Sequence, residues 1–556
     1  MMDEERVPLL WKAPTEKQYN EKSENPNGRP SIQGLSLLTA TLCIVDLFGV
    51  FPVVTMPRII INCGWFGFPL VIGVLILQVY TSLLLGRCWI MAERLQPSII
   101  QQSRRPYAAL AQMTYGESFS RIVTFILDIT VFGAGVPNLI VASQNLQILG
   151  EKAVSFGWRL SYCYWMPIVA LFLGPIMWLG SPKDMKWLVV SSSLTVTTVS
   201  LLTWHCFMAS DVADPPPLPS ITWEAIAIGY GVLAFQFDIH PTILTIQVDM
   251  ADKGKIGCAV IIGFLITGTL FLTTSVLGAI YYSTELDYNV MQTLQPSIVM
   301  DINVLLVILQ ICLSTVIGAT PLFQDLEDKL GVDREFNFKR ILLRSGLMIL
   351  SLALAEMVPR FDLIMGLIGG TFMGPLMFVL PPLFYARLRA MEPQPQLEAV
   401  SARNTETATI ITVAFAHQPP DHIEYSMKQT PIHYTNPRRN NKVRRSKQSF
   451  EGKSYNLIPK EKHFEDLPSP TTDKAQLSFF RNIKTNFLNL ASLDNYPKIG
   501  PLTAWERLKT AVVVIAGISA TLISTYYSVR GTIRYARFAP PCLLNVTAAT
   551  LAIEDW

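Results

Sequence analysis

Apolar residues in this chain gather into long segments separated by polar connections. A helix that crosses a bilayer needs about 20 predominantly apolar residues, and these segments are of about that length or longer. They lie at residues 35–61, 66–92, 119–148, 162–180, 186–208, 221–250, 256–282, 298–323, 341–358, 361–387 and 508–529. The pattern predicts an all-α polytopic membrane protein with about 11 transmembrane helices.

Two of the segments are interrupted in their middle by residues that disfavour a helix. The first is broken at residues 49–57 and the second at residues 235–241, where Asp238 and His240 also lie. An unpaired backbone amide in hydrocarbon costs several kcal/mol, so a broken helix is tolerated only where it lines a cavity or packs within protein. Proline and glycine can also merely kink an ordinary span. The acid and the imidazole at the second break favour a site.

The two breaks are five spans apart, at corresponding places of two five-helix halves. This placement is typical of transporters built from inverted repeats, in which half-helix ends converge near the bilayer midplane on solute and ion. The predicted parts of the chain are a disordered cytoplasmic tail at 1–34, a transporter core at 35–389, a long disordered cytoplasmic loop at 390–505, an eleventh helix at 506–530 and a carboxyl-terminal tail at 531–556.

Composition and charge agree with this class and set the orientation. Half of the residues (50%) are apolar, 16% are charged, and the mean hydropathy is +0.34. Lysine and arginine concentrate in alternate connections, whereas 211–220 and 282–297 hold none. The positive-inside rule therefore places the amino terminus in the cytoplasm, and an odd number of spans places the carboxyl end outside or in a lumen. The net charge of +3 gives no indication of nucleic-acid binding.

The polar parts of the sequence hold few further signals. A basic run at 438–447 either touches anionic membrane lipid or belongs to a solvated linker. The eight cysteines show no CxxC pair or metal-type spacing, so no metal site is predicted, and no cofactor site is readable. Cys163 and Cys206 both fall toward the outer face, which leaves a disulfide between them open. No nucleophile–base pair indicates an enzyme.

The residues around both breaks resemble the amino acid/auxin permease family. At the first break the chain has Asp-Leu-Phe-Gly at 46–49, Met-Pro at 56–57 and Asn-Cys-Gly-Trp-Phe-Gly at 62–67, in the order of that family's glycine-rich break, proline and GW-x-G. Residues 234–250, Ala-Phe-Gln-Phe-Asp-Ile-His-Pro-Thr-Ile-Leu-Thr-Ile-Gln-Val-Asp-Met, are similar to its sixth helix. The resemblance covers residues 35–387.

The resemblance implies a LeuT-like five-plus-five (5+5) inverted repeat with broken helices 1 and 6, and secondary active transport of amino acids driven by a proton or sodium gradient. The chain departs from the family at the first break. Members usually have Gly-x-Gly there, whereas this chain has Gly49-Val50-Phe51 followed by Pro52, which has no N–H to donate. A smaller or different solute, or a loss of transport, therefore remains an alternative.

The chemistry of an amino acid selects the candidate binding residues. Its carboxylate needs bare backbone N–H groups and its ammonium needs carbonyl or carboxylate oxygens, which helix amino and carboxyl ends supply. Gly49 lets a solute approach the backbone closely. Asp46, one turn earlier, either holds a cation or caps the helix. The predicted substrate-binding residues are Asp46, Gly49, Val50, Phe51, Phe235, Phe237, Asp238 and His240.

The coupling ion has two candidates, a proton or sodium. Asp238 with His240 either couples a proton or binds the ammonium of the solute, or the two make a structural hydrogen bond across the broken helix. LeuT-type proteins often offer hydroxyls to sodium at the place of Ser314 and Thr315, although serine and threonine also join membrane helices. A charged side chain at the centre of a membrane span costs about 2.5–3.5 kcal/mol. Asp128, which lies deep in a predicted span, is therefore expected to pair with another residue inside the bundle.

A second function class stays open, because a transporter-like protein can act as an amino acid sensor that binds at the same breaks without net transport.

Two short motifs bear on the cellular location and the topology of the protein. Glu5 with Leu9 and Leu10 resembles an acidic dileucine sorting signal, which adaptors read to send cargo to endosomes and lysosomes. The sequon at Asn545 predicts a glycan if the carboxyl end is lumenal.

Overall fold

The computed structural model describes residues 34–102, 105–153, 160–178, 185–210, 215–332, 336–358, 360–391 and 502–535. The predicted sorting signal (Glu5, Leu9 and Leu10), almost all of the 390–505 loop and the sequon at Asn545 lie outside these ranges. The regular elements of the described part are all helices, apart from one isolated β-bridge.

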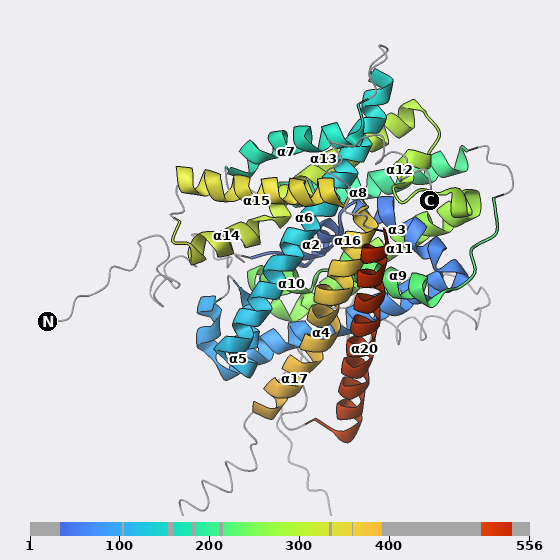
Figure 1. Cartoon of the computed structure of the whole chain (residues 1–556). Coiled ribbons are helices and arrows are strands. Elements are labelled where there is room, and N and C mark those ends of the chain that lie inside the picture. The colour runs from blue at the N-terminus through green and yellow to red at the C-terminus, as the bar shows by residue number, and fades with distance from the viewer. Residues whose placement is uncertain are drawn as a thin grey trace, which may run out of the picture. The chain divides into compact units, whose positions relative to one another are not determined.

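Nineteen α- and π-helices and four short 3-10 helices make up this part (Figure 1). The α-helices are α2 (Leu37–Phe48), α3 (Phe51–Asn62), α4 (Gly67–Leu95), α5 (Pro106–Tyr115), α6 (Glu117–Ala153), α7 (Tyr162–Trp178), α8 (Met185–Met208), α9 (Trp223–Gln236), α10 (His240–Asp249), α11 (Ile256–Tyr281), α12 (Val290–Thr293), α13 (Ile298–Gly318), α14 (Thr320–Lys329), α15 (Phe338–Met357), α16 (Phe361–Ile368), α17 (Leu380–Met391) and α20 (Ala504–Tyr535). The π-helices are η5 (Gly369–Met373) and η6 (Pro375–Val379), and the 3-10 helices are η1 (Gly64–Phe66), η2 (Pro97–Gln102), η3 (Lys253–Lys255) and η4 (Ser283–Glu285).

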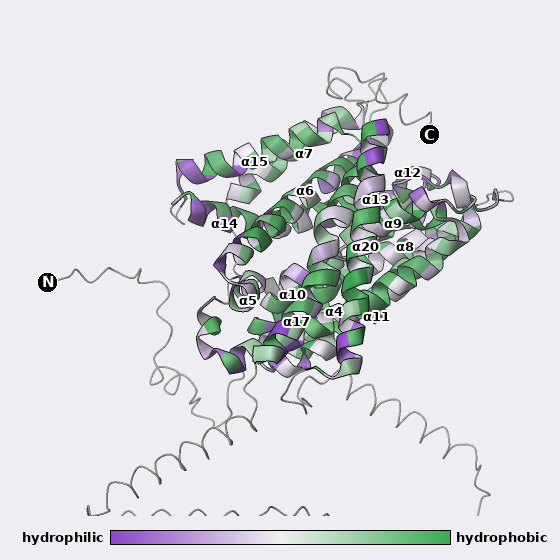
Figure 2. Ribbon diagram, turned by 60° about the horizontal axis from the view of Figure 1, so that its bottom comes forward, coloured by the Kyte–Doolittle hydropathy of each residue, from purple (hydrophilic) through white to green (hydrophobic). Residues whose placement is uncertain are grey.

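The helices have the length and composition of a polytopic membrane protein. Six stretches of the described chain are long and apolar enough to cross a membrane, and the bent pair α2 and α3 makes a seventh when it is counted as one span. Apolar residues run along these helices, and hydrophilic residues gather toward helix ends (Figure 2). Each predicted apolar segment overlaps one or more of the described helices, but the count of 11 spans and the inverted repeat remain predictions.

Polar caps explain where several helices begin. Ser36 accepts a hydrogen bond from the Thr39 amide at the start of α2, and Thr222 accepts one from the Ala225 amide at the start of α9, both at 3.2 Å. Each cap satisfies one of the backbone N–H groups that a first helical turn leaves without a partner. The short polar stretches between apolar segments therefore set the helix starts as well as separating the spans.

The stretch from α16 to α17 packs tightly against α9. Its middle consists of the π-helices η5 and η6, a rare form that is often found at functional sites. Helix α20 lies beside α9, α16 and both π-helices (Figure 1). A Cβ on Gly369 would lie 1.9 Å from the Gly231 carbonyl oxygen and 2.8 Å from the Phe235 amide nitrogen. The absence of a side chain at Gly369 therefore sets how closely η5 approaches α9.

We expect Gly369→Ala to destabilise the protein, because the added methyl group would collide with the backbone of α9. Overpacking of a close-packed interior typically costs about 1–3 kcal/mol. Gly346→Ala in α15 is the matched control, since its Cβ would meet nothing within 4 Å. Thermal unfolding of the purified protein in detergent is the measurement. Equal melting temperatures of the two variants would contradict this account of the α9–η5 contact.

A disulfide between Cys163 and Cys206 does not form. Cys163 is disulfide-bonded, but Cys206 is a free thiol. Helix α7, which carries Cys163, packs mainly against α6 and α15, whereas α8, which carries Cys206, packs against α2, α11 and α13. The two cysteines therefore belong to different packing neighbourhoods, and the shared outer level that the sequence indicates is not enough for a bond.

Candidate functional site

The first break is a sharp bend between α2 and α3. The two half-helices meet at 55°, and Gly49 between them has φ of +61° and ψ of −163°. A residue with a side chain rarely adopts this backbone conformation. The break is shorter than the predicted 49–57, because Pro52 lies in the first turn of α3, where its missing N–H costs nothing, and Pro57 is accommodated inside the helix.

Polar side chains from two other helices reach the first break. The Val50 amide donates a hydrogen bond to Gln310 Oε1 of α13 at 3.3 Å, and Gln310 Nε2 donates to Ser192 Oγ of α8 at 3.2 Å. Ser192 also lies near Asp46 on α2. Neither Gln310 nor Ser192 was among the residues predicted from the sequence. Their signal was available, since a glutamine in the apolar run of α13 needs a partner.

The second break lies beside the first. Helix α9 ends at Gln236 and α10 begins at His240, with Pro241 in its first turn, so the break is the link 237–239. Gln236 Nε2 donates a hydrogen bond to Thr55 Oγ1 of α3 at 2.8 Å, and α3 packs along α9. The two broken segments are therefore in direct contact.

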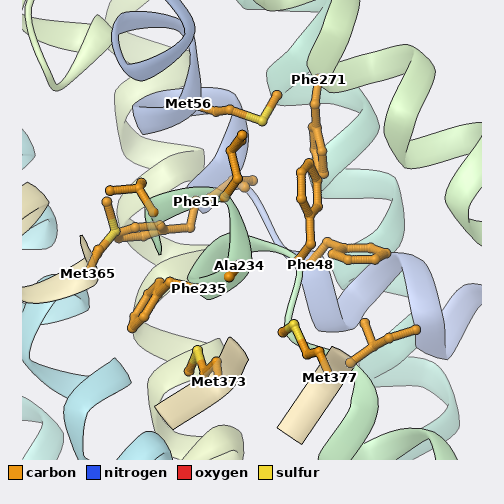
Figure 3. Packing of buried hydrophobic residues seen from close by; sticks show 14 of the residues in the cluster. Phe48, Phe51, Met56, Ala234, Phe235, Phe271, Met365, Met373 and Met377 are labelled. Atoms are coloured by element: carbon orange, nitrogen blue, oxygen red, sulfur yellow. The ribbon is translucent and has the colours of Figure 1, made fainter. Parts of the chain in front are cut away.

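Apolar side chains surround the two breaks. Phe51 and Phe235 lie near Met365 and Met373 of the α16–η5 stretch (Figure 3). Phe237 lies elsewhere, because its ring is fully buried, stacks on Phe271 at 6.2 Å and meets Phe48 edge-on at 5.9 Å. Of the predicted aromatic residues, Phe51 and Phe235 thus share one environment, whereas Phe237 packs into the core against α2 and α11.

Asp238 and His240 point to different neighbours. Asp238 is half-buried in the link, and its Oδ1 has no hydrogen-bond partner among the described residues. His240 is fully buried, with Nε2 at 2.9 Å from Thr81 Oγ1 and 3.3 Å from Ser82 Oγ on α4, and with Nδ1 unpartnered in the described part. Neither ring nitrogen bonds Asp238, because α10 begins at His240 and its first turn carries the ring toward α4.

The α13 side chain that bonds the first break is Gln310. Ser314 lies one turn further along this helix and is half-buried. Thr315 donates its hydroxyl to the Ile311 carbonyl at 2.7 Å and lines a cavity of about 40 Å³ with residues of α6, α7 and α15. Asp128 pairs with Lys329 at 2.9 Å, as the cost of an unpaired buried charge requires.

A polar and aromatic cluster lies at the far end of α3. Tyr288 Oη accepts hydrogen bonds from Asn62 at 3.2 Å and from Arg360 at 3.3 Å, and Arg360 also binds Asp362 at 2.6 Å. The Phe361 ring contacts both Tyr288 and Phe51 edge-on, at 6.5 and 6.4 Å between ring centres. This cluster therefore borders the first break through Phe51.

Backbone hydrogen bonds join the other ends of the broken pairs. The Leu35 amide donates to the Asp249 carbonyl at 2.8 Å, and the Ala251 amide donates to the Leu35 carbonyl at 3.1 Å. The start of α2 is thus tied to the end of α10. These two half-helices, one from each broken pair, are therefore linked at their predicted cytoplasmic ends, and they also pack against each other.

The chain is similar to a family model and to several known proteins. The family model described as transmembrane amino acid transporter protein matches residues 34–416. Amino acid transporter AVT1H of Arabidopsis thaliana is 22% identical over 338 residues, which cover 60% of this chain and 77% of the relative. Sodium-coupled neutral amino acid symporter 2 of Danio rerio is 25% identical over 180 residues, which cover 31% of this chain and 35% of the relative. Sodium-coupled neutral amino acid transporter 4 of Homo sapiens is 26% identical over 164 residues, which cover 28% and 30%.

Proposed function

Because the chain belongs to the transmembrane amino acid transporter family, we propose that it moves amino acids across a membrane as a secondary active transporter, by alternating access around the two breaks. The observation that carries the proposal is the junction of the breaks through Thr55 and Gln236, at 2.8 Å. It brings the amino end of α3, which favours a carboxylate, beside the carboxyl end of α9, which favours an ammonium. Both ends of a free amino acid then find a partner in one place.

The surroundings of the breaks favour a neutral amino acid. Phe51, Phe235, Met365 and Met373 are apolar, and methionine adapts its shape to side chains of different size. Two of the relatives are named as carriers of neutral amino acids. We therefore assign the substrate as a free amino acid with an uncharged side chain, whose carboxylate lies toward Gly49 and Val50.

The coupling ion is a proton in this proposal. Asp238 lies in the link of the second break and offers a carboxylate oxygen without a hydrogen-bond partner in the described part. A carboxylate without a partner inside a membrane protein is stabilised when it takes up a proton or binds a cation. Sodium at Ser314 and Thr315 is the alternative, and the hydrogen bond of Thr315 to its own helix weighs against it.

The test is flux of labelled neutral amino acids into proteoliposomes that contain the purified full chain, under separately imposed proton and sodium gradients. We expect accumulation with the proton gradient alone. Accumulation with sodium alone would contradict proton coupling. Saturable binding without flux under either gradient would contradict transport and favour an amino acid sensor.

Endosomal or lysosomal residence is part of the same proposal. We expect that replacing Leu9 and Leu10 together by alanine moves the protein toward the plasma membrane, because adaptors read the leucine pair behind an acid such as Glu5 in a cytoplasmic tail. Surface biotinylation of cells that express the two proteins measures the shift. Replacement of the neighbouring Val7 by alanine is the control, and an unchanged surface fraction in the double variant would exclude this signal.

The carboxyl end has its own test. A lumenal end would expose Asn545 to glycosylation, so Asn545→Gln should remove any glycan shift on a gel. A carboxyl-terminal tag that antibody reaches after selective permeabilisation of the plasma membrane would contradict the odd number of spans.

A further inference from the structure

We propose that Gln310 is a positioning residue that occupies the first break as an internal competitor of the substrate carboxylate, which displaces its amide oxygen from Val50. The inference rests on the proposed function and names a regulatory contact within the same site. Its basis is the position of the Gln310 side-chain amide. This amide lies within hydrogen-bond distance of the Val50 N–H at the break, although Gln310 is 260 positions later in the chain.

The orientation of the amide follows from its partners. The Val50 N–H is a donor, so the atom of Gln310 that faces it is the carbonyl oxygen Oε1, at 3.3 Å. Nε2 then faces Ser192 Oγ at 3.2 Å and donates to it. Gln310 is only 2% exposed, and both functional atoms of its amide are used. The side chain is therefore held in one pose.

The place that Gln310 Oε1 occupies is one that a carboxylate would seek. Val50 is the N-cap of α3, and the amino end of a helix attracts anions through its free N–H groups and its dipole. Pro52 removes one of the donors that this end would otherwise offer. Fewer N–H groups are therefore left to bind an anion at this end, and Gln310 accepts a hydrogen bond from one of them, that of Val50.

Displacement is chemically favourable and has a consequence at Asp46. Hydrogen bonds to a charged acceptor are roughly twice as strong as those to a neutral one, so a carboxylate outcompetes an amide oxygen. Once released, Gln310 still holds Ser192, which lies near Asp46 on the other half-helix. The donors run in one direction, from Val50 to Gln310 and from Gln310 to Ser192. Substrate binding at α3 is thus communicated to α2 through α13 and α8.

Gln310→Met tests the competition, because methionine nearly conserves the volume of the side chain but cannot hold the Val50 amide as an amide oxygen does. We expect KM to fall about 2- to 10-fold, which is the range of one net hydrogen bond. Gln310→Glu should act in the opposite direction. Its carboxylate would repel the carboxylate of the substrate, so KM should rise above that of the parent, and more so as the pH rises and the added group ionises.

The assay is uptake of the twenty proteinogenic amino acids, each labelled, by proteoliposomes with the full chain. Gln144→Met is the matched control, since this buried glutamine of α6 bonds Asn289 rather than a break and should keep the parent KM. A KM that stays or rises in Gln310→Met overturns the inference, because a purely structural role would not lower it. A parent protein that transports none of the twenty overturns the proposed function and the inference together.

Discussion

Gly49→Leu is expected to abolish transport while the protein still inserts and folds. Two effects act together at this position. The backbone of Gly49 has φ of +61°, which strains any residue with a side chain, and a Cβ would lie 2.9 Å from Gln310 Nε2 and 3.2 Å from its Oε1. The branched leucine would push Gln310 away and fill the approach to Val50. A misplacement of about 1 Å in a binding site can cost about 100-fold in rate.

Uptake by proteoliposomes measures the loss, and the elution profile of the purified variant in detergent reports its folding. Gly135→Leu is the matched control, because Gly135 lies in α6 and its Cβ would meet nothing within 4 Å. Transport at the parent rate in Gly49→Leu would move the site away from the first break. Aggregation of the variant would instead call for Gly49→Ala, where the same strain and contact should lower transport with a smaller added volume.

Asp238→Asn is expected to remove accumulation against a gradient and to leave exchange partly intact. Asparagine keeps the shape and the polar character of the carboxyl group but cannot take up or release a proton. Since each pH unit is worth 1.36 kcal/mol, one proton per solute supports about tenfold accumulation per unit of imposed gradient. The parent should approach that ratio, and the variant should equilibrate near one to one.

Two readouts from the same vesicles separate coupling from damage. Accumulation under an imposed proton gradient, measured between pH 5 and 8, reports coupling. Exchange of external labelled solute for internal unlabelled solute reports an intact binding site. His240→Asn is the comparison variant for Asp238→Asn, because His240 is hydrogen-bonded to Thr81 and Ser82 and not to Asp238. Accumulation by Asp238→Asn equal to that of the parent across this pH range would exclude proton coupling through Asp238.

Much of this arrangement could be predicted from the sequence, because the bilayer imposes a simple rule on it. Hydrocarbon demands long apolar helices, so the apolar segments predict the helices of the described chain, and glycine and proline within two of them predict the breaks. Gly49 shows how far this prediction from the sequence extends. Its permissive backbone predicts a bend, and the bend is there, but the extent of the break depends on whether each nearby proline falls in a first turn.

The sequence by itself determined the membrane class, the two broken helices and the resemblance to a transporter family, because each of these depends on local composition or on a short motif. Tertiary structure alone decided which distant side chains meet at the breaks. Gln310 of α13 reaches the Val50 amide and also bonds Ser192 of α8, and Phe237 turns away because α11 supplies Phe271 as a partner. Similarly, His240 bonds α4 rather than the nearby Asp238. Contacts between residues far apart in the chain arise from packing, which the order of the residues alone does not show.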